Sequence, residues 1–177
     1  MSGPARRHLV LVGLMGAGKS TVGALCATRL GRPFVDTDDL VEVLAGGRVA
    51  DVFAQGEETF RALERDAVAD ASASPAPLVI ACGGGAVLDA RNRAQLQQSG
   101  FVVWLQGEPA VLADRVEADR VERPLLAADR PVVVLTELAA ARAGAYEAVA
   151  DVAVPTDDRT PTQVADAVLE EFARCAA

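Results

Sequence analysis

Short, uninterrupted apolar runs alternate along this chain with longer stretches in which apolar residues recur every three or four positions. Runs without polar alternation are typical of strands that are buried on both faces, as in a parallel sheet. They predict β-strands at residues 8–12, 33–36, 78–82, 101–105 and 152–154.

The intervening stretches predict helices, because spacings of three and four put apolar side chains on one helical face. The expected helices span residues 21–30, 40–45, 49–53, 57–71, 89–98, 109–116, 135–149 and 161–173. This alternation indicates an α/β fold of three layers, a central five-stranded parallel sheet with helices on both faces. We expect residues 1–177 to form a single domain, with ligands bound at the carboxyl ends of the strands.

The first predicted strand leads into Gly13–Ser20, which matches the phosphate-binding pattern G-x-x-x-x-G-K-[ST], the P-loop. Between a strand and a helix, such a loop directs backbone N–H groups and the positive helix end at one anion. Lys19 then reaches the β- and γ-phosphates of a nucleotide, and the Ser20 hydroxyl becomes a ligand of Mg²⁺. Lys19 is the only lysine beside sixteen arginines, which indicates a need for a slender ammonium group. The alternative is a glycine-rich turn that matches by chance.

Composition and charge narrow the classes of partner. The net charge of −8 argues against nucleic acid or an anionic membrane, since both bind basic surfaces. Three cysteines without a C-x-x-C pair are typical of reduced thiols in a cytoplasmic protein. No apolar run is long enough to span a bilayer, and no exposed heptad pattern argues against a monomer. The only histidine, His8, lies in or beside the first predicted strand, and we expect a structural role for it.

Two carboxylates follow the second predicted strand. Asp36 and Asp38 form D-x-D, and in an extended stretch both side chains would face the same way. The central strand 78–82 ends without a carboxylate, so Asp36 is the nearest candidate to hold Mg²⁺. One of the pair could serve the metal while the other acts as general base toward an acceptor hydroxyl. The alternative is a pair of helix N-cap carboxylates in a solvated turn.

Arginines in three places are candidates for binding anionic groups. Arg61 and Glu64 lie three apart on a helix, either as a surface ion pair or as an arginine that Glu64 orients to clamp a substrate carboxylate. Arg123 falls in an arginine-rich segment without clear periodicity, which predicts a mobile lid over approximately residues 115–131. A lid arginine over the phosphates would stabilise charge on the transferring group. For Arg142, on the following helix, the alternative to a site role is a solvated helix face.

Three glycines, Gly83, Gly84 and Gly85, follow the central predicted strand. They form either a flexible turn or, as suits three glycines after a buried strand better, a segment whose backbone approaches a ligand closely.

Together these motifs resemble those of the shikimate kinase family, in order and at compatible spacings from about Leu9 to Phe172. The matching elements are G-L-M-G-A-G-K-S-T at 13–21, D-T-D at 36–38, F-R-x-x-E at 60–64, G-G-G-A at 83–86, R-P-L-L at 123–126 and R-x-x-x-Y at 142–146. Each element after the P-loop is weak by itself, but six in sequence are highly specific.

The resemblance implies a role for each matching residue. Lys19 and Arg123 would stabilise the transferring γ-phosphoryl group, and Asp38 would bind ring hydroxyls and act as the base. Arg61 and Arg142 would bind the shikimate carboxylate. The substrate site as a whole would comprise Asp38, Arg61, Gly83, Gly84, Gly85 and Arg142.

The resemblance also implies an ATP site with Mg²⁺. The residues expected to bind ATP are Gly16, Ala17, Gly18, Lys19, Ser20, Thr21, Arg123 and Arg159. Mg²⁺ would be held by Ser20 and by Asp36, directly or through water. Either Arg115 or Arg120 would contact adenine.

The implied reaction is ATP-dependent phosphorylation of the 3-hydroxyl of shikimate, which gives shikimate 3-phosphate and ADP on the route to chorismate and the aromatic amino acids. Catalysis would consist mostly of positioning and charge stabilisation. One alternative is another small-molecule P-loop kinase, such as a gluconate kinase, which has no need for two arginines directed at a ring carboxylate. The other is a non-catalytic nucleotide-binding domain.

Overall fold

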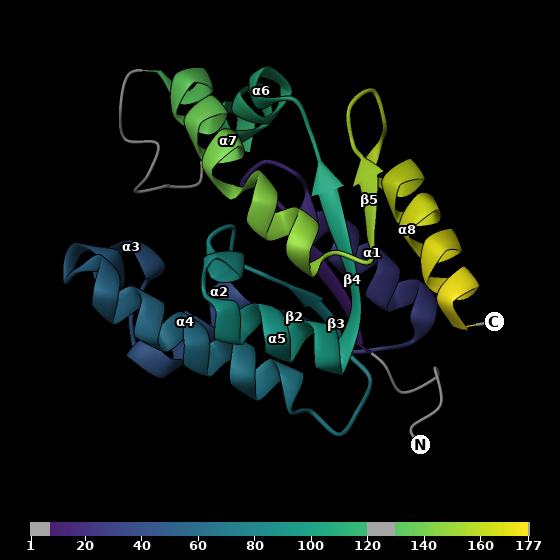
Figure 1. The fold of residues 1–177 in the computed structure, drawn as a ribbon, viewed down its shortest axis with the longest axis horizontal. Helices are drawn as coiled ribbons and strands as arrows, with labels where there is room; N and C mark the ends of the chain where they lie inside the picture. Colours follow the sequence, from purple (N-terminus) through teal and green to yellow (C-terminus); the bar gives the residue numbers. More distant parts are fainter. Residues whose placement is uncertain (1–7, 120–129, 177) are drawn as a thin grey trace.

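The computed structural model describes residues 8–119 and 130–176. Five strands form one parallel sheet, as predicted, in the order β2-β3-β1-β4-β5 (Figure 1). The strands are β1 (His8–Val12), β2 (Phe34–Asp36), β3 (Val79–Ala81), β4 (Gly100–Gln106) and β5 (Val152–Pro155). The central strand β1 pairs with both β3 and β4, so that Leu9 lies beside Val79 on one side and Phe101 on the other.

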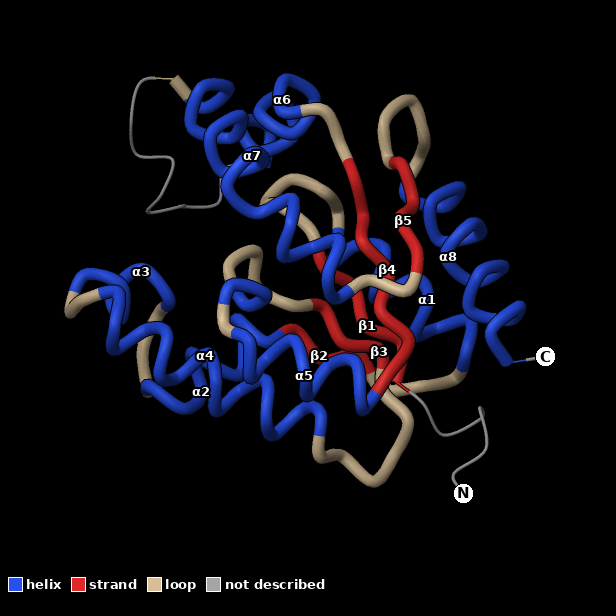
Figure 2. Tube along the Cα trace, viewed as in Figure 1, coloured by secondary structure: helices blue, strands red, loops and turns tan. Residues whose placement is uncertain are grey.

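Helices cover both faces of this sheet (Figure 2). They are α1 (Lys19–Leu30), α2 (Thr37–Ala45), α3 (Val49–Ala54), α4 (Glu57–Ser72), η2 (Ala86–Leu88), α5 (Ala90–Ser99), α6 (Pro109–Asp119), α7 (Pro131–Val149) and α8 (Pro161–Ala176). Helices α1 and α8 pack against each other on one face, and α5 and α7 pack on the other. No described helix has the length and apolarity needed to cross a membrane.

The hydrophobic core explains why the strand runs lack polar residues. Leu9, Val10 and Leu11 of β1 have no exposed surface, because the sheet is covered on both faces. A second, smaller apolar cluster lies between α2, α3 and α4 and is formed by their own residues Val41, Val52, Phe60 and Ala67. These three helices therefore carry their own apolar support at the β2 edge of the sheet.

One predicted helix boundary near the site was wrong. Helix α7 begins at Pro131 rather than 135, with proline in the first turn, where its missing N–H removes no helical hydrogen bond. Of the expected lid of approximately 115–131, residues 115–119 form the end of α6 and residue 131 opens α7. The interior of that lid, which includes Arg120 and Arg123, lies outside the described residues.

Candidate active site

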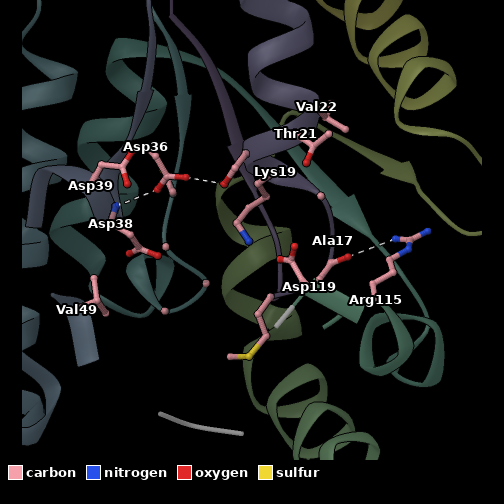
Figure 3. A pocket seen from close by; sticks show the side chains of 18 of the residues that line it. Ala17, Lys19, Thr21, Val22, Asp36, Asp38, Asp39, Val49, Arg115 and Asp119 are labelled. Carbon is pink, nitrogen blue, oxygen red and sulfur yellow. Dashed lines mark hydrogen bonds between the residues drawn. The ribbon is translucent and has the colours of Figure 1, made fainter. Parts of the chain in front are cut away.

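The chemistry-bearing segments meet at the carboxyl ends of the strands, as expected for a parallel sheet. They line one cavity of about 770 Å³. The predicted residues that border it are Gly16, Ala17, Gly18, Lys19, Ser20, Thr21, Asp36, Asp38, Arg61, Gly83, Gly84, Gly85, Arg142 and Arg159. Figure 3 shows the Lys19 side chain in this cavity, between the carboxylates of Asp36 and Asp38 and the guanidinium of Arg115. Residues from six separate segments of the chain thus share one cavity.

The P-loop follows β1 and depends on glycine at two positions. Gly13 and Gly16 have φ angles of +148° and +80°, and a Cβ at either would lie 2.5 or 2.6 Å from a backbone carbonyl oxygen. Gly18 precedes the first residue of α1 in a left-handed conformation, so no side chain caps the first N–H groups of the helix. Lys19 folds back and donates a 2.9 Å hydrogen bond to the Leu14 carbonyl. The loop thus presents backbone donors and one ammonium group to an anion.

The D-x-D segment differs from the expected extended pair. Asp36 ends β2, but Asp38 already lies in the first turn of α2, because Oδ1 of Asp36 accepts the N–H of Asp38 at 3.0 Å and caps the helix. The other oxygen of Asp36, Oδ2, accepts the Ser20 hydroxyl at 2.6 Å. Asp36 therefore fills the capping role of the alternative interpretation and also contacts the P-loop.

Asp38 occupies a half-buried and electrostatically unusual position. Burial, with the nearby charge of Asp36, raises the pKa of its carboxyl to about 6, and Lys19 opposes the rise. A carboxylate with a raised pKa is a better proton acceptor than an exposed one. This environment fits Asp38 to a general base rather than to a solvated cap.

Arg61 and Glu64 are not a surface ion pair. Glu64 has 2% exposed surface, and its Oε2 accepts a 2.8 Å hydrogen bond from Nη1 of Arg61. Burial raises the pKa of the Glu64 carboxyl, whereas the charges of Arg61 and Arg142 oppose that rise. A second acid, Glu57, accepts from Nη2 of Arg61 at 3.2 Å. The guanidinium is therefore held in one orientation by two carboxylates on its own helix.

The glycine segment is closely packed rather than a free turn. The N–H of Gly83 donates to the Thr37 hydroxyl at 2.9 Å. A Cβ on Gly83 would lie 2.6 Å from Oδ1 of Asp38, and a Cβ on Gly85 would collide with the Arg61 guanidinium. Glycine is thus required so that the backbone can approach the acid and the arginine.

Arg142 also lies inside the site. It has 4% exposed surface, so the alternative of a solvated helix face is wrong. A Cβ on Gly84 would lie 3.4 Å from Nη1 of Arg142. Two guanidinium groups, from α4 and α7, therefore flank the same glycine segment.

On the other side of Lys19, the cavity is bordered by α6 and by the segment between β5 and α8. Arg115 donates to the hydroxyl and the carbonyl oxygen of Thr156 at 2.9 and 2.8 Å, and to the Gly16 carbonyl at 3.4 Å. Arg159 lines the same side. Of the two arginines considered for adenine, Arg115 is the described one, and it lines the cavity. No sequence pattern pointed to Thr156, because it meets Arg115 only through contacts across the fold.

This P-loop, which shares its cavity with an acid from β2 and with arginines from α4 and α7, defines a phosphotransferase of the P-loop class. The family model for shikimate kinase matches residues 15–173. The chain therefore belongs to the shikimate kinase family.

Individual relatives agree with this assignment. A shikimate kinase from Symbiobacterium thermophilum is 51% identical over 167 residues, which cover 93% of this chain and 95% of the relative. The structure of shikimate kinase from Acinetobacter baumannii in complex with shikimate superimposes with a TM-score of 0.90 at 35% identity, covering 96% of this chain and 94% of that one. A gluconokinase from Sinorhizobium meliloti has a TM-score of 0.65 at 23% identity, which shows a shared fold alone.

Proposed function

We propose that this chain transfers the γ-phosphoryl group of ATP to the 3-hydroxyl of shikimate, a step toward chorismate and the aromatic amino acids. The observation that carries the proposal is the shared cavity, which brings Lys19, Asp38 and the two arginines Arg61 and Arg142 together. A phosphate site, a base and a carboxylate site are the three parts that this reaction needs.

In this mechanism the P-loop amides and Lys19 bind the β- and γ-phosphates. Arg61 and Arg142 bind the substrate carboxylate and so orient the ring, with its 3-hydroxyl toward Asp38. Asp38 accepts the hydroxyl proton as the oxygen attacks the γ-phosphorus, and ADP leaves. Holding both reactants in this way lowers the barrier chiefly through orientation and charge stabilisation. Arg123, outside the described residues, is the proposed lid residue that adds positive charge at the γ-phosphoryl group.

Mg²⁺ is the proposed cofactor, with Ser20 and Asp36 as its protein partners, directly or through water. Both offer oxygen, the donor that Mg²⁺ prefers, and their oxygens lie 2.6 Å apart at the phosphate end of the cavity. The ion would neutralise negative charge on the β- and γ-phosphates. On the nucleotide side, Arg115 and Arg159 are the proposed adenine contacts. We further propose a cytoplasmic monomer without nucleic acid or membrane partners.

The decisive experiment measures ADP release by a coupled assay across a panel of cyclic and linear hydroxy acids. We expect turnover with shikimate and little with gluconate, since gluconate lacks the ring carboxylate geometry. Turnover with gluconate alone would favour the other kinase class, and ATP binding without any turnover would favour a nucleotide-binding domain. As a site control, Arg61→Ala should raise the KM for shikimate and leave the KM for ATP unchanged.

A further inference from the structure

Tyr146 ends the R-x-x-x-Y pattern, and none of the roles above uses it. It lies one helical turn after Arg142 on α7, so both side chains project from the same face of the helix. Its side chain is buried, with 1% of the residue surface exposed. A fully buried hydroxyl next to a substrate site needs a hydrogen-bond partner.

The Tyr146 hydroxyl joins α7 to the glycine segment. It donates a 2.6 Å hydrogen bond to the Gly84 carbonyl oxygen. The Arg142 guanidinium packs against the same glycine, because a Cβ placed on Gly84 would lie 3.4 Å from Nη1 of Arg142. The phenolic proton goes to Gly84, so the phenolic oxygen can act toward the Arg142 guanidinium only as an acceptor. Tyr146 thus fixes the glycine backbone against which the arginine packs.

The neighbours of Gly84 extend this connection to the P-loop. A Cβ on Gly84 would lie 3.5 Å from the Gly13 carbonyl oxygen and 3.6 Å from the Met15 N–H nitrogen. Gly84 therefore lies between the arginine of the proposed carboxylate site and the backbone of the phosphate site. Movement of Gly84 would change the distance between the two substrates.

The tyrosine is itself held in place. Trp104 of β4 stacks on its ring, with 5.4 Å between ring centroids and 22° between ring planes. Burial raises the pKa of Tyr146 to about 12, although the charge of Arg142 opposes this rise. The hydroxyl therefore remains protonated, and able to donate to Gly84, throughout the neutral pH range.

We propose that Tyr146 is a positioning residue for the acceptor: its hydroxyl holds the Arg142 guanidinium and the Gly84 carbonyl in register, so that Arg142 meets the shikimate carboxylate in one orientation. The inference rests on the proposed function, since it takes Arg142 as a partner of that carboxylate. An arginine that is already held loses less side-chain freedom when its ligand binds.

The first test is Tyr146→Phe, which keeps the ring stacked on Trp104 and removes only the hydroxyl. We expect the KM for shikimate to rise about tenfold, and the KM for ATP to change less than about twofold, since the hydrogen bond that fixes Gly84 beside Arg142 is lost. The matched control is Val149→Ala, a core truncation on the same helix that lowers the melting temperature and leaves both KM values unchanged. An unchanged KM for shikimate in the Phe variant, or an equal rise for both substrates, would overturn the proposal.

Coupling to Arg142 supplies a second readout. In an Arg142→Lys background, Tyr146→Phe should raise the KM for shikimate less than about twofold, because the phenolic oxygen no longer orients a guanidinium. A full tenfold rise in that background would contradict a role exerted through Arg142.

A spectroscopic measurement avoids dependence on the folding of the Phe variant. Tyr146 is the only tyrosine of the chain, so 3-fluorotyrosine labels this position alone. The single ¹⁹F resonance should shift when shikimate saturates the protein, and an unchanged resonance would refute the proposal. If the wild-type protein does not phosphorylate shikimate, the proposed function itself is refuted. If the wild-type protein is active and the Phe variant has unchanged kinetics, only the role of Tyr146 is refuted.

Discussion

The Ser20 hydroxyl donates to Oδ2 of Asp36 at 2.6 Å, while Oδ1 of the same carboxylate caps α2 by accepting the Asp38 N–H at 3.0 Å. One side chain thus connects the P-loop to the helix that carries the proposed base. The two functions of Asp36 can be separated, because asparagine is as good an N-cap as aspartate but carries no charge.

We therefore expect Asp36→Asn to raise the Mg²⁺ concentration needed for half-maximal activity by about tenfold or more, with stability unchanged within about 0.5 kcal/mol. Asp36→Ala should show the same metal defect and also lose about 1 kcal/mol of stability, because the cap is gone. Magnesium titrations of initial rate and urea unfolding measure the two effects. An Asn variant with a wild-type Mg²⁺ requirement would show that Asp36 serves only the helix.

Lys19 should be indispensable for turnover but not for folding. Lys19→Met removes the ammonium group and its hydrogen bond to Leu14, and we expect kcat to fall at least about 100-fold, with a nearly unchanged melting temperature. Lys19→Arg is the informative companion, since a planar guanidinium cannot replace a point charge within the loop. Normal kinetics in the Met variant would refute the P-loop mechanism.

Much of the fold could be predicted from the sequence because the apolar runs that form the sheet are local and continuous. The P-loop could be predicted for a related reason: its pattern, its strand and its helix all lie within one stretch of chain. Local signals of this kind also gave the correct strand number and direction.

The parts that could not be predicted depend on contacts between distant segments. Arg142 is buried because Gly84 and Glu64 come from other elements, and no periodicity in α7 reveals that. Asp38 was expected in an extended stretch, since the spacing of D-x-D does not disclose that Asp36 caps a helix directly after it. The contacts of Thr37 and Thr156 were not predicted either, because they are hydrogen bonds across the fold, to Gly83 and Arg115 respectively.

The pKa of Asp38 gives a pH dependence for catalysis. If Asp38 is the base, kcat/KM for shikimate should rise with pH through about 6 and level off above it, because only the ionised carboxylate accepts the proton. Asp38→Asn should lower kcat far more than ATP affinity. A defect confined to ATP binding would instead reassign Asp38 to the metal.

The same pKa predicts that the ionised form of Asp38, which is the active one, lowers the stability of the fold. The folded-state pKa of Asp38 is raised above the unfolded value. The contribution of Asp38 to the free energy of unfolding is therefore most favourable at low pH and declines as pH rises from about 4 through 6. Asp38→Asn removes this loss, so the inactive variant should be more stable than wild type by about 2–3 kcal/mol at pH 8 and equal to it near pH 4. Urea unfolding at the two pH values measures the difference, and a less stable variant at pH 8 would contradict the buried-charge argument.

Gly85 offers a steric test of the carboxylate site. Its φ is −100°, so alanine suffers no backbone strain there, but the added Cβ would meet the Arg61 guanidinium. We expect Gly85→Ala to raise the KM for shikimate at least about tenfold by displacing Arg61. The matched control is Gly47→Ala, where a Cβ meets nothing within 4 Å and kinetics should not change. Equal kinetics in both variants would exclude Arg61 from the site.

His8 predicts a pH dependence of stability that is independent of the active site. Its Nδ1 accepts the N–H of Leu78 at 3.0 Å, which requires that nitrogen to be unprotonated, and burial lowers the pKa of the ring. The unfolded chain therefore takes up a proton more readily than the folded one. Stability from this residue should be complete above about pH 6.5 and decline as pH falls through that value.

His8→Asn isolates this effect, because the asparagine Oδ1 can replace Nδ1 as the acceptor and does not titrate. The stability of wild type minus that of the variant should shrink between pH 7.5 and pH 5.5, and the subtraction cancels the opposite contribution of Asp38. Urea unfolding at both pH values gives the four free energies. If the difference stays constant, the ring is protonated equally in both states, and the hydrogen bond from Leu78 cannot be the reason that His8 is buried at the start of β1.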